Sequence, residues 1–284
     1  MKLVVVIALA AIVTHHSGGP SRFAAPREVE IIGLDYAFRA PAEIRSGPTT
    51  FRFRNAGKAR HELVIVRLKQ GATIDQLVQR MKDSLPIADV VDGNVGVLFA
   101  DTGKRSTAGL TTTLTGGREY VIYCQFRDTL TAPRHFQMGM YSLLKVKPSP
   151  SIATLERIKV DTIVAHDYAF VYPRTLAPGP HVFVFRNDGK VLHEFNIALL
   201  KRGVTLQQFL ERRRTNAPTR DLVDEGLGVL LSQSRSESLG RLTVNLLSGR
   251  EYRIICIFRD DPKAPPHFQL GMYGSIQVTG NPGG

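Results

Sequence analysis

Residues 117–128 read GREYVIYCQFRD, and residues 249–260 read GREYRIICIFRD at an offset of 132 positions. Each stretch is rich in β-branched and aromatic residues and is bounded by glycine and aspartate, a pattern typical of a β-strand. Each also carries one cysteine, Cys124 or Cys256, and the chain of 284 residues has no other cysteine. The two stretches therefore predict a pair of equivalent strands, each ending at a thiol.

The repeat extends along the chain on both sides of these strands. Residues 51–62 read FRFRNAGKARHE, and residues 183–194 read FVFRNDGKVLHE. Residues 132–141 and 264–273 read APRHFQMGMY and APPHFQLGMY. Because the offset is constant, neither copy has a net insertion relative to the other, which indicates a duplicated unit.

The repeat and the proline-rich stretch at residues 147–151 divide the chain. Proline resists both the helix interior and the central strand, so we place a linker there. The sequence starts with Met1 and Lys2, which are followed by an apolar run at residues 3–13. That run is too short to span a bilayer and is typical of a secretory signal, which predicts export to the periplasm or the extracellular space. The expected division is a leader at 1–26, domains at 27–147 and 159–280, and a linker at 148–158.

Each unit is predicted to be mostly β. In the first unit, short apolar runs punctuated by Gly, Pro and Asn predict strands at residues 30–38, 49–54, 62–68, 110–114, 119–126 and 140–146. One helix interrupts the strands: Thr73 can cap a segment in which Ile74, Leu77, Val78 and Met81 share one face. Thr205, Leu206, Phe209 and Leu210 repeat this pattern. We expect an all-β sandwich per unit, with one helix inserted between the strand of the first histidine and that of the cysteine.

Four residue types recur around the predicted strands at the same offset. The first unit carries His61, Cys124, His135 and Met140, and the second carries His193, Cys256, His267 and Met272. Two imidazoles and a thiolate in a plane, with a weak axial thioether, are the ligands of a blue copper site. A neighbouring methionine, Met138, is replaced by Leu270 in the second unit, so the retained methionines are the axial candidates.

These segments resemble the plastocyanin-like cupredoxin family. The resemblance rests on the Asn-x-Gly turn before the first histidine, the strand-ending cysteine, and a second histidine followed after three residues by Gly-Met. It covers both units. It implies two tandem Greek-key cupredoxin-like β-sandwiches, one type 1 copper per domain, and one-electron transfer.

Two features depart from the pattern of the small members of that family. Ten residues separate Cys124 from His135, a longer interval than in those proteins, although copper nitrite reductase relatives also have long loops. Glu62 and Glu194 follow the first histidine where the family often has a small polar residue. A carboxylate there could change the potential or aid metal capture.

Two structural explanations compete with metal ligation. The two cysteines of an exported protein often form a disulfide, and a lone buried cysteine is often a small core residue. Histidines beside apolar strands are also often core residues. Duplicated packing would be copied as faithfully as duplicated chemistry, so the repeat leaves these alternatives open.

Three classes of function are compatible with these residues: an electron carrier, a multicopper enzyme, and a copper carrier or metal-free interaction module. Multicopper oxidases and nitrite reductases need additional histidines; of the eight here, only His166 and His181 lie outside the two sets and the leader, and neither is matched in the first unit. We therefore predict an electron carrier rather than an enzyme, with a copper carrier or a metal-free cupredoxin-like interaction module as the alternative. The net charge of +12 is compatible with an acidic redox partner, an anionic surface or nucleic acid and does not choose among them; the copper hypothesis predicts a redox partner protein. Without an arginine-rich recognition element or zinc-finger spacing, we expect no nucleic acid, and no membrane span beyond the leader.

Overall fold

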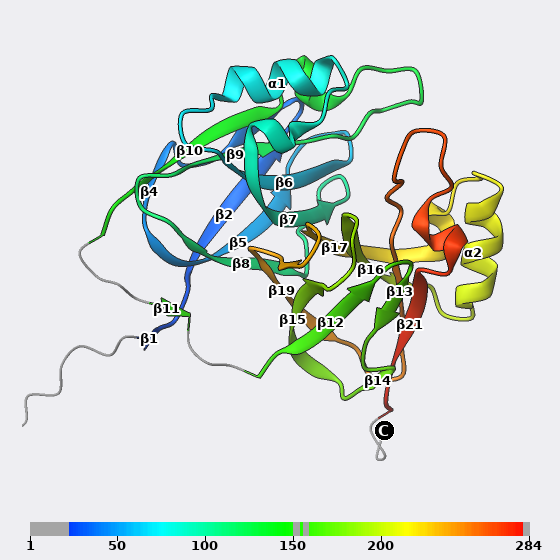
Figure 1. Ribbon diagram of the computed structural model, residues 1–284. Coiled ribbons are helices and arrows are strands. Elements are labelled where there is room, and N and C mark those ends of the chain that lie inside the picture. Colours follow the sequence, from blue (N-terminus) through cyan, green and yellow to red (C-terminus); the bar gives the residue numbers. More distant parts are fainter. Residues whose placement is uncertain (1–22, 150–153, 156–158, 281–284) are drawn as a thin grey trace, which may run out of the picture.

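Most β-strands of the chain stack as two large sheets, and each half contains one α-helix (Figure 1). The structure, a computed structural model, describes residues 23–149, 154–155 and 159–280. Residues 1–22 of the predicted leader, and residues 150–153 and 156–158 of the predicted linker, lie outside the described residues. Within the described part, no helix is both long and apolar enough to cross a membrane. The predicted all-β class with one inserted helix per unit is confirmed.

The first half of the chain contains ten strands and one α-helix in the described residues. They are β1 (Phe23–Ala24), β2 (Arg27–Leu34), β3 (Ala37–Arg39), β4 (Glu43–Arg45), β5 (Gly47–Asn55), β6 (His61–Leu68), α1 (Ile74–Lys82), β7 (Val91–Ala100), β8 (Gly109–Leu114), β9 (Glu119–Tyr123) and β10 (Tyr141–Lys147). A short 3-10 helix, η2 (His135–Met138), precedes β10.

The second half repeats this order with one additional two-residue strand, β18. It contains β11 (Thr154–Leu155), β12 (Asp161–His166), β13 (Ala169–Val171), β14 (Thr175–Leu176), β15 (Gly179–Asn187), β16 (His193–Leu200), α2 (Leu206–Arg214), β17 (Val223–Ser232), β18 (Ser236–Glu237), β19 (Arg241–Leu246), β20 (Glu251–Ile255), η4 (His267–Leu270) and β21 (Tyr273–Val278).

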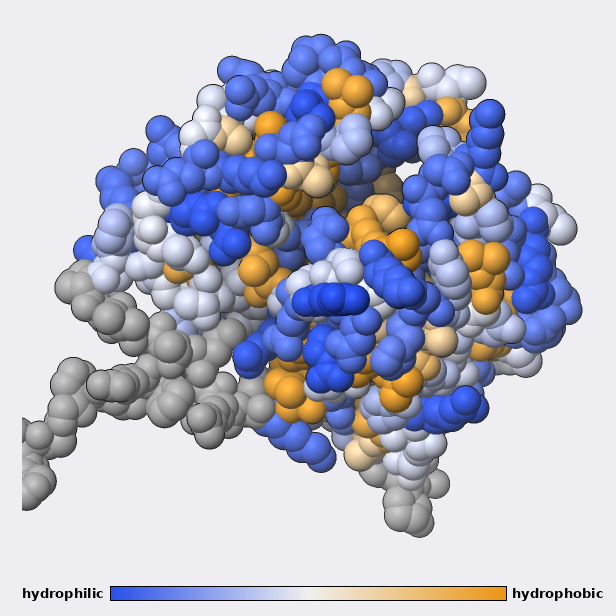
Figure 2. Space-filling view, in the orientation of Figure 1, coloured by the Kyte–Doolittle hydropathy of each residue, from blue (hydrophilic) through white to orange (hydrophobic). Residues whose placement is uncertain are grey.

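Both large sheets run through both units. One has the order β14-β21-β20-β16-β17-β7-β6-β9-β10-β4, and the other has the order β13-β12-β15-β19-β8-β5-β2-β3. The sheets enclose one continuous apolar core, to which both units contribute. The face shown in Figure 2 is mainly hydrophilic, with small separate hydrophobic groups. Apolar side chains are thus concentrated between the sheets and beneath the helices.

The inserted helices form where the sequence predicts them. Thr73 accepts a hydrogen bond from the amide of Gln76, whose side chain accepts one from the amide of Thr73, a capping box that fixes the start of α1. Thr205 and Gln208 cap α2 in the same way. Leu77 of α1 packs into a cluster with side chains of β6 and β9, so the helix covers the outer face of the longer sheet (Figure 1).

The two units meet along an approximate two-fold axis. Val97 of β7 pairs with Val229 of β17, and Leu110 of β8 pairs with Leu242 of β19, both in antiparallel register. In each pair the two residues are equivalents in the repeat. Antiparallel pairing of a residue with its own equivalent is what two-fold symmetry requires, so the joint has the form of an isologous dimer within one chain.

Contacts beside this axis have diverged between its two sides. The amide and the hydroxyl of Thr107 donate hydrogen bonds of 3.0 and 2.9 Å to Oε1 of Glu225. At the equivalent place Leu239 covers Gly93, where an added Cβ would lie 2.1 Å from the leucine Cδ1. Self-pairing of either unit would lose both contacts, because Thr107 would face Gly93 and Leu239 would face Glu225. The joint therefore favours one copy of each unit.

Gly96 provides a test of this joint. Its φ of +140° disfavours any side chain, and an added Cβ would lie 2.8 Å from the carbonyl oxygen of Val229 and 2.7 Å from Cδ1 of Leu110. We expect Gly96→Ala to lower the free energy of unfolding by about 1–3 kcal/mol more than Gly47→Ala, because overpacking adds to backbone strain. Gly47 is a matched control with φ of +119° and no atom within 4 Å of an added Cβ. Urea unfolding measures both losses; equal losses would contradict tight packing at the joint.

Candidate metal centres

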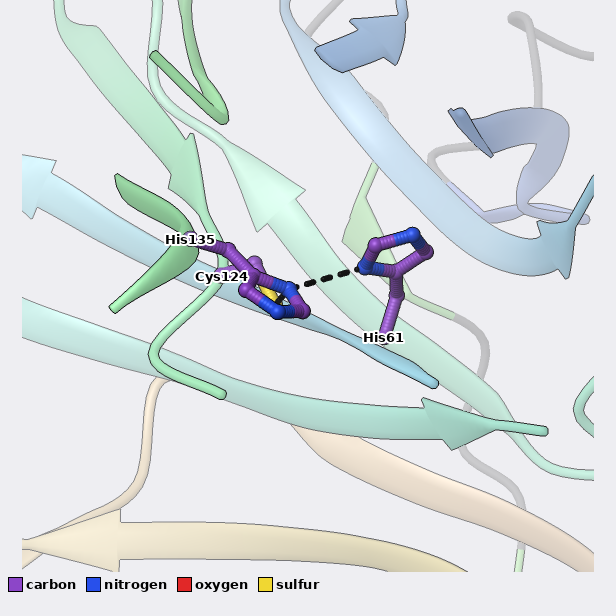
Figure 3. Close-up of side chains that lie close together, drawn as sticks. All are labelled: His61, Cys124 and His135. Carbon is purple, nitrogen blue, oxygen red and sulfur yellow. Dashed lines mark hydrogen bonds between the residues drawn. The ribbon is translucent and has the colours of Figure 1, made fainter. Parts of the chain in front are cut away.

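Each unit brings its two histidines and its cysteine into one buried cluster. His61, Cys124 and His135 offer three ligand atoms that all lie within 4.8 Å of one another, and their side chains point together (Figure 3). His193, Cys256 and His267 form the equivalent group. All six residues are fully buried. The structure thus gathers the three predicted equatorial residues of each unit.

The disulfide alternative is wrong. Cys124 and Cys256 are both free, and each lies in its own cluster. The remaining structural alternative, core packing alone, has to account for three polar ligand atoms that converge in each cluster.

Backbone hydrogen bonds close the long loop between cysteine and second histidine. The amide of His135 donates to the carbonyl of Phe126 at 2.8 Å, and the amide of Phe136 donates to that of Cys124 at 2.9 Å. The loop therefore leaves the cysteine strand and returns to it, so its length does not separate the two side chains. The second unit has the same pair of bonds, at His267 and Phe268.

The predicted axial methionines lie beside the clusters. Met140 is fully buried; its amide donates to the carbonyl of His135 at 3.0 Å, and its carbonyl accepts from the amide of Cys124 at 3.2 Å. Met272 makes the same contacts in the second unit. Their backbone positions are thus tied to two of the three cluster residues.

The 3.4 Å between Sγ and the nearer Nδ1 in each cluster suits one small metal ion, whereas the two Nδ1 atoms lie slightly closer together than two donors of one ion. The Nδ1 atoms of His61 and His135 are 3.0 Å apart, and Nδ1 of His135 lies 3.4 Å from Sγ of Cys124. Donors bonded to a metal at about 2.0–2.3 Å in a tetrahedral or trigonal arrangement are roughly 3.3–3.9 Å apart. In the second unit the two Nδ1 atoms are 3.1 Å apart, and Sγ of Cys256 lies 3.4 and 4.0 Å from them. A nitrogen, nitrogen and sulfur donor set of this kind favours a soft transition metal.

A carboxylate fixes the outward nitrogen of the second histidine. Oδ1 of Asp128 lies 3.1 Å from Nε2 of His135, and Oδ2 accepts a 2.7 Å hydrogen bond from the hydroxyl of Tyr36. The hydrogen bond from Tyr36 is the main cause that lowers the pKa of Asp128, so the carboxylate is charged at neutral pH. Such an acceptor holds the proton on Nε2 and leaves the Nδ1 lone pair for a metal.

The second unit repeats this arrangement, and the sequence contains its signal. Asp260 lies 3.0 Å from Nε2 of His267 and accepts a 2.6 Å hydrogen bond from Tyr168. These residues are not among the site residues predicted from the sequence. The tetrapeptide Asp-Tyr-Ala-Phe, which occurs at residues 35–38 and 167–170, and the aspartates that end both cysteine stretches would have indicated them.

The first histidine is held neutral by its surroundings. Burial, and secondarily His135, lower the pKa of His61 to about 4. Its Nε2 is buried without a hydrogen-bond partner, and Oδ1 of Asp35 lies 3.8 Å away. A neutral imidazole is the form that binds a metal, so no proton needs to leave this ring at neutral pH.

The glutamate after the first histidine connects two strands around the thiol. The amide of Glu62 donates to Sγ of Cys124 at 3.4 Å, and Oε1 accepts from the amide of Gln125 at 2.9 Å. Burial raises the pKa of Glu62 to about 7 and that of the Cys124 thiol to about 12. The thiol therefore keeps its proton until a metal displaces it. The departure from the family pattern at this position thus has a structural role: the glutamate binds the backbone beyond the cysteine.

Comparison with known proteins yields structural neighbours only. No protein-family model matches the chain, and no curated protein is similar to it in sequence. Its structural neighbours include reduced auracyanin from Roseiflexus castenholzii, which is 21% identical over 44% of this chain and 100% of that one, with a TM-score of 0.30. A copper nitrite reductase from Nitrosomonas europaea is 13% identical over 90% of this chain and 94% of that one, with a TM-score of 0.26. A multicopper oxidase is 13% identical over 89% of each chain, also with a TM-score of 0.26.

The Asp128 contact yields a prediction for metal affinity. In a Cys256→Ser background, which leaves only the first cluster complete, we expect Asp128→Ala to weaken Cu(I) binding about 10- to 100-fold. The ring of His135 then loses the acceptor that fixes its orientation. Competition with a chromophoric chelator measures the affinity.

Asp188→Ala is the matched control, because Asp188 is an exposed carboxylate of the second unit that pairs with Arg186 and does not belong to the first cluster. Equal affinities for the two aspartate variants would show that Asp128 does not orient the histidine for binding.

Proposed function

We propose that this protein is an exported electron carrier with one type 1 copper in each unit. The observation that carries the proposal is the convergence of two Nδ1 atoms and one Sγ in a buried cluster that occurs twice. The outward nitrogen of the second histidine in each cluster lies beside a carboxylate, as a metal-binding imidazole requires. The copper proteins among the structural neighbours agree with this choice of metal.

Each residue has a defined part in such a site. His61, Cys124 and His135 would hold the metal in a plane, with Met140 as the axial candidate. Copper bound there would supply a one-electron couple. His61 enters this role already neutral, and Cys124 releases its proton when the metal binds.

A rigid metal site from which water is excluded suits electron transfer better than catalysis. The ligands come from strand ends and from a loop closed by backbone bonds, which limits movement between oxidation states. Phe136, next to the second histidine, is 2% exposed and packs in the helix-covered cluster. Full burial leaves no open position at which a substrate would reach the metal.

The remaining histidines support a carrier over a multicopper enzyme. Among the described residues, only the two clusters gather three or more metal-binding side chains. Both ring nitrogens of His181 already have partners, with Oδ2 of Asp161 at 2.7 Å and the carbonyl of Ala177 at 2.9 Å. The net charge of +12 favours an acidic protein as the redox partner.

Copper titration of the mature protein tests the proposal. We expect two coppers per chain and an intense visible band from thiolate-to-copper charge transfer. Cys124→Ser and Cys256→Ser should each remove one copper and about half of the band, since each thiolate serves one site. Circular dichroism of both variants should match that of the wild type.

Other outcomes select the alternatives. Tight colourless binding of Cu(I) would favour a copper carrier. No bound copper and no band would leave duplicated core packing and an interaction module. Loss of the fold in Cys124→Ser would assign the thiol to the core rather than to a metal.

A further inference from the structure

The two clusters share their ligands but differ in the layer of side chains beneath the helices. In the second unit this layer contains Arg253, Asn196 and Phe209. The equivalent residues of the first unit are Val121, Val64 and Leu77, which form part of an apolar cluster. The second unit thus has a guanidinium at a position where the first unit has an apolar side chain.

The Arg253 side chain is enclosed by its neighbours. The residue is 8% exposed, and its Nη1 donates to the carbonyl and to Oδ1 of Asn196 at 2.8 and 2.7 Å. The guanidinium carbon lies 5.0 Å from the ring centroid of Phe209 on α2, a cation–π contact. Burial lowers the pKa of Arg253 to about 9, so the guanidinium remains charged at neutral pH.

This charge lies on the strand that leads to the second thiol. Arg253 belongs to β20, and Cys256 follows the end of that strand three residues later, which corresponds to about 10 Å along the backbone. The two side chains lie on opposite faces of the sheet, because Arg253 packs under α2 and Cys256 faces the core. Asn196, the hydrogen-bond partner of Arg253, lies two residues beyond Glu194, whose amide donates to Sγ of Cys256 at 3.4 Å. The guanidinium and the thiol are therefore parts of one hydrogen-bonded section of the sheet.

Other charges near the clusters do not cancel this difference. Glu62 and Glu194 are repeat equivalents, so each unit has one carboxylate at this position. Near Glu62, the side chain of Arg60 is 41% exposed and pairs with Asp101 at 3.1 Å. Arg134 in the first unit and Arg213 in the second are half-buried at the surface. Solvent screens these surface charges far more than it screens Arg253.

We propose that Arg253 makes the two copper centres unequal and raises the reduction potential of the second above that of the first. This inference rests on the proposed copper function. A nearby positive charge disfavours Cu(II) more than Cu(I). One unit charge at about 10 Å, with an effective dielectric constant of about 20, shifts the equilibrium about tenfold. An electron from the redox partner protein would reduce the copper held beside Cys256 first, while the copper held beside Cys124 would stay oxidised.

Single-centre variants test the order of potentials. Cys124→Ser keeps the second centre and Cys256→Ser keeps the first, and redox titration of the visible band gives each potential. Both potentials are measured at one pH, below the pKa of about 9 of Arg253, so that its guanidinium stays charged. We expect the second centre to be more easily reduced by about tenfold, or about 59 mV for one electron.

Substitutions in the Cys124→Ser background assign the difference to the charge. The double substitution Asn196→Val and Arg253→Val copies the first unit. It should lower the reduction potential of the second centre by about 59 mV, which corresponds to the same tenfold change. Arg253→Lys keeps the charge and should retain most of the potential. Arg213→Met is the matched control: it also copies the first unit, at Met81, but removes a charge that solvent screens, so its shift should be less than half as large.

Each result has one meaning. Equal potentials in the two single-centre variants, or an unchanged potential in the double valine variant, would overturn this inference while leaving the copper function intact. Absence of bound copper would instead contradict the proposed function. If the double valine variant does not fold by circular dichroism, Arg253→Gln, a neutral side chain that still reaches Asn196, replaces it in the comparison.

Discussion

Burial of both faces of β6 and β16 is the constraint on which the rest of the structure depends. In β6, Leu63 and Ile65 face the core between the sheets, while Val64 and Val66 face the cluster under α1. A one-residue slip would exchange these two sets and break both packings, so the register of the strand is fixed. His61 is its first residue, and the position of the candidate ligand follows from the packing of the strand behind it. The inserted helix therefore contributes to the geometry of the site although none of its residues belongs to it.

Duplication has preserved the candidate ligands and changed their surroundings. Two-fold pairing of Val97 with Val229 keeps the units in one framework, and both clusters retain the same aspartate and tyrosine contacts. Beside the axis and under the helices, equivalent positions differ in polarity and charge, as at Thr107 and Leu239. Conserved donor geometry within diverged packing is the pattern expected when two centres perform one chemistry with different energetics.

The parts of the fold that could be predicted are those whose signal is local. The helix start at Thr73 and the histidine–cysteine sets follow from short patterns, and all of them are found in the structure. Strand β7 was missed because Gly93 and Gly96 interrupt its apolar pattern, and those glycines are needed by the opposite unit, which the local sequence does not reveal. Residues 30–38 were predicted as one strand, but the chain turns at Tyr36, whose φ of +60° separates β2 from β3. That turn brings the tyrosine ring against His135, with 5.2 Å between centroids, so the missed turn and the missed site residue have one cause.

The protonation states of the clusters explain how the fold can form a site without its metal. The imidazole of His61 is neutral and the thiol of Cys124 is protonated, so burying these two groups costs little desolvation energy. The charged groups lie outside this ring of donors, where Asp128 is exposed to solvent and also bound to Tyr36. A metal that enters gains three donors already in place and displaces one proton. Strand packing rather than the metal positions these donors. A change in the oxidation state of a bound metal would therefore move them little, as rapid one-electron exchange requires.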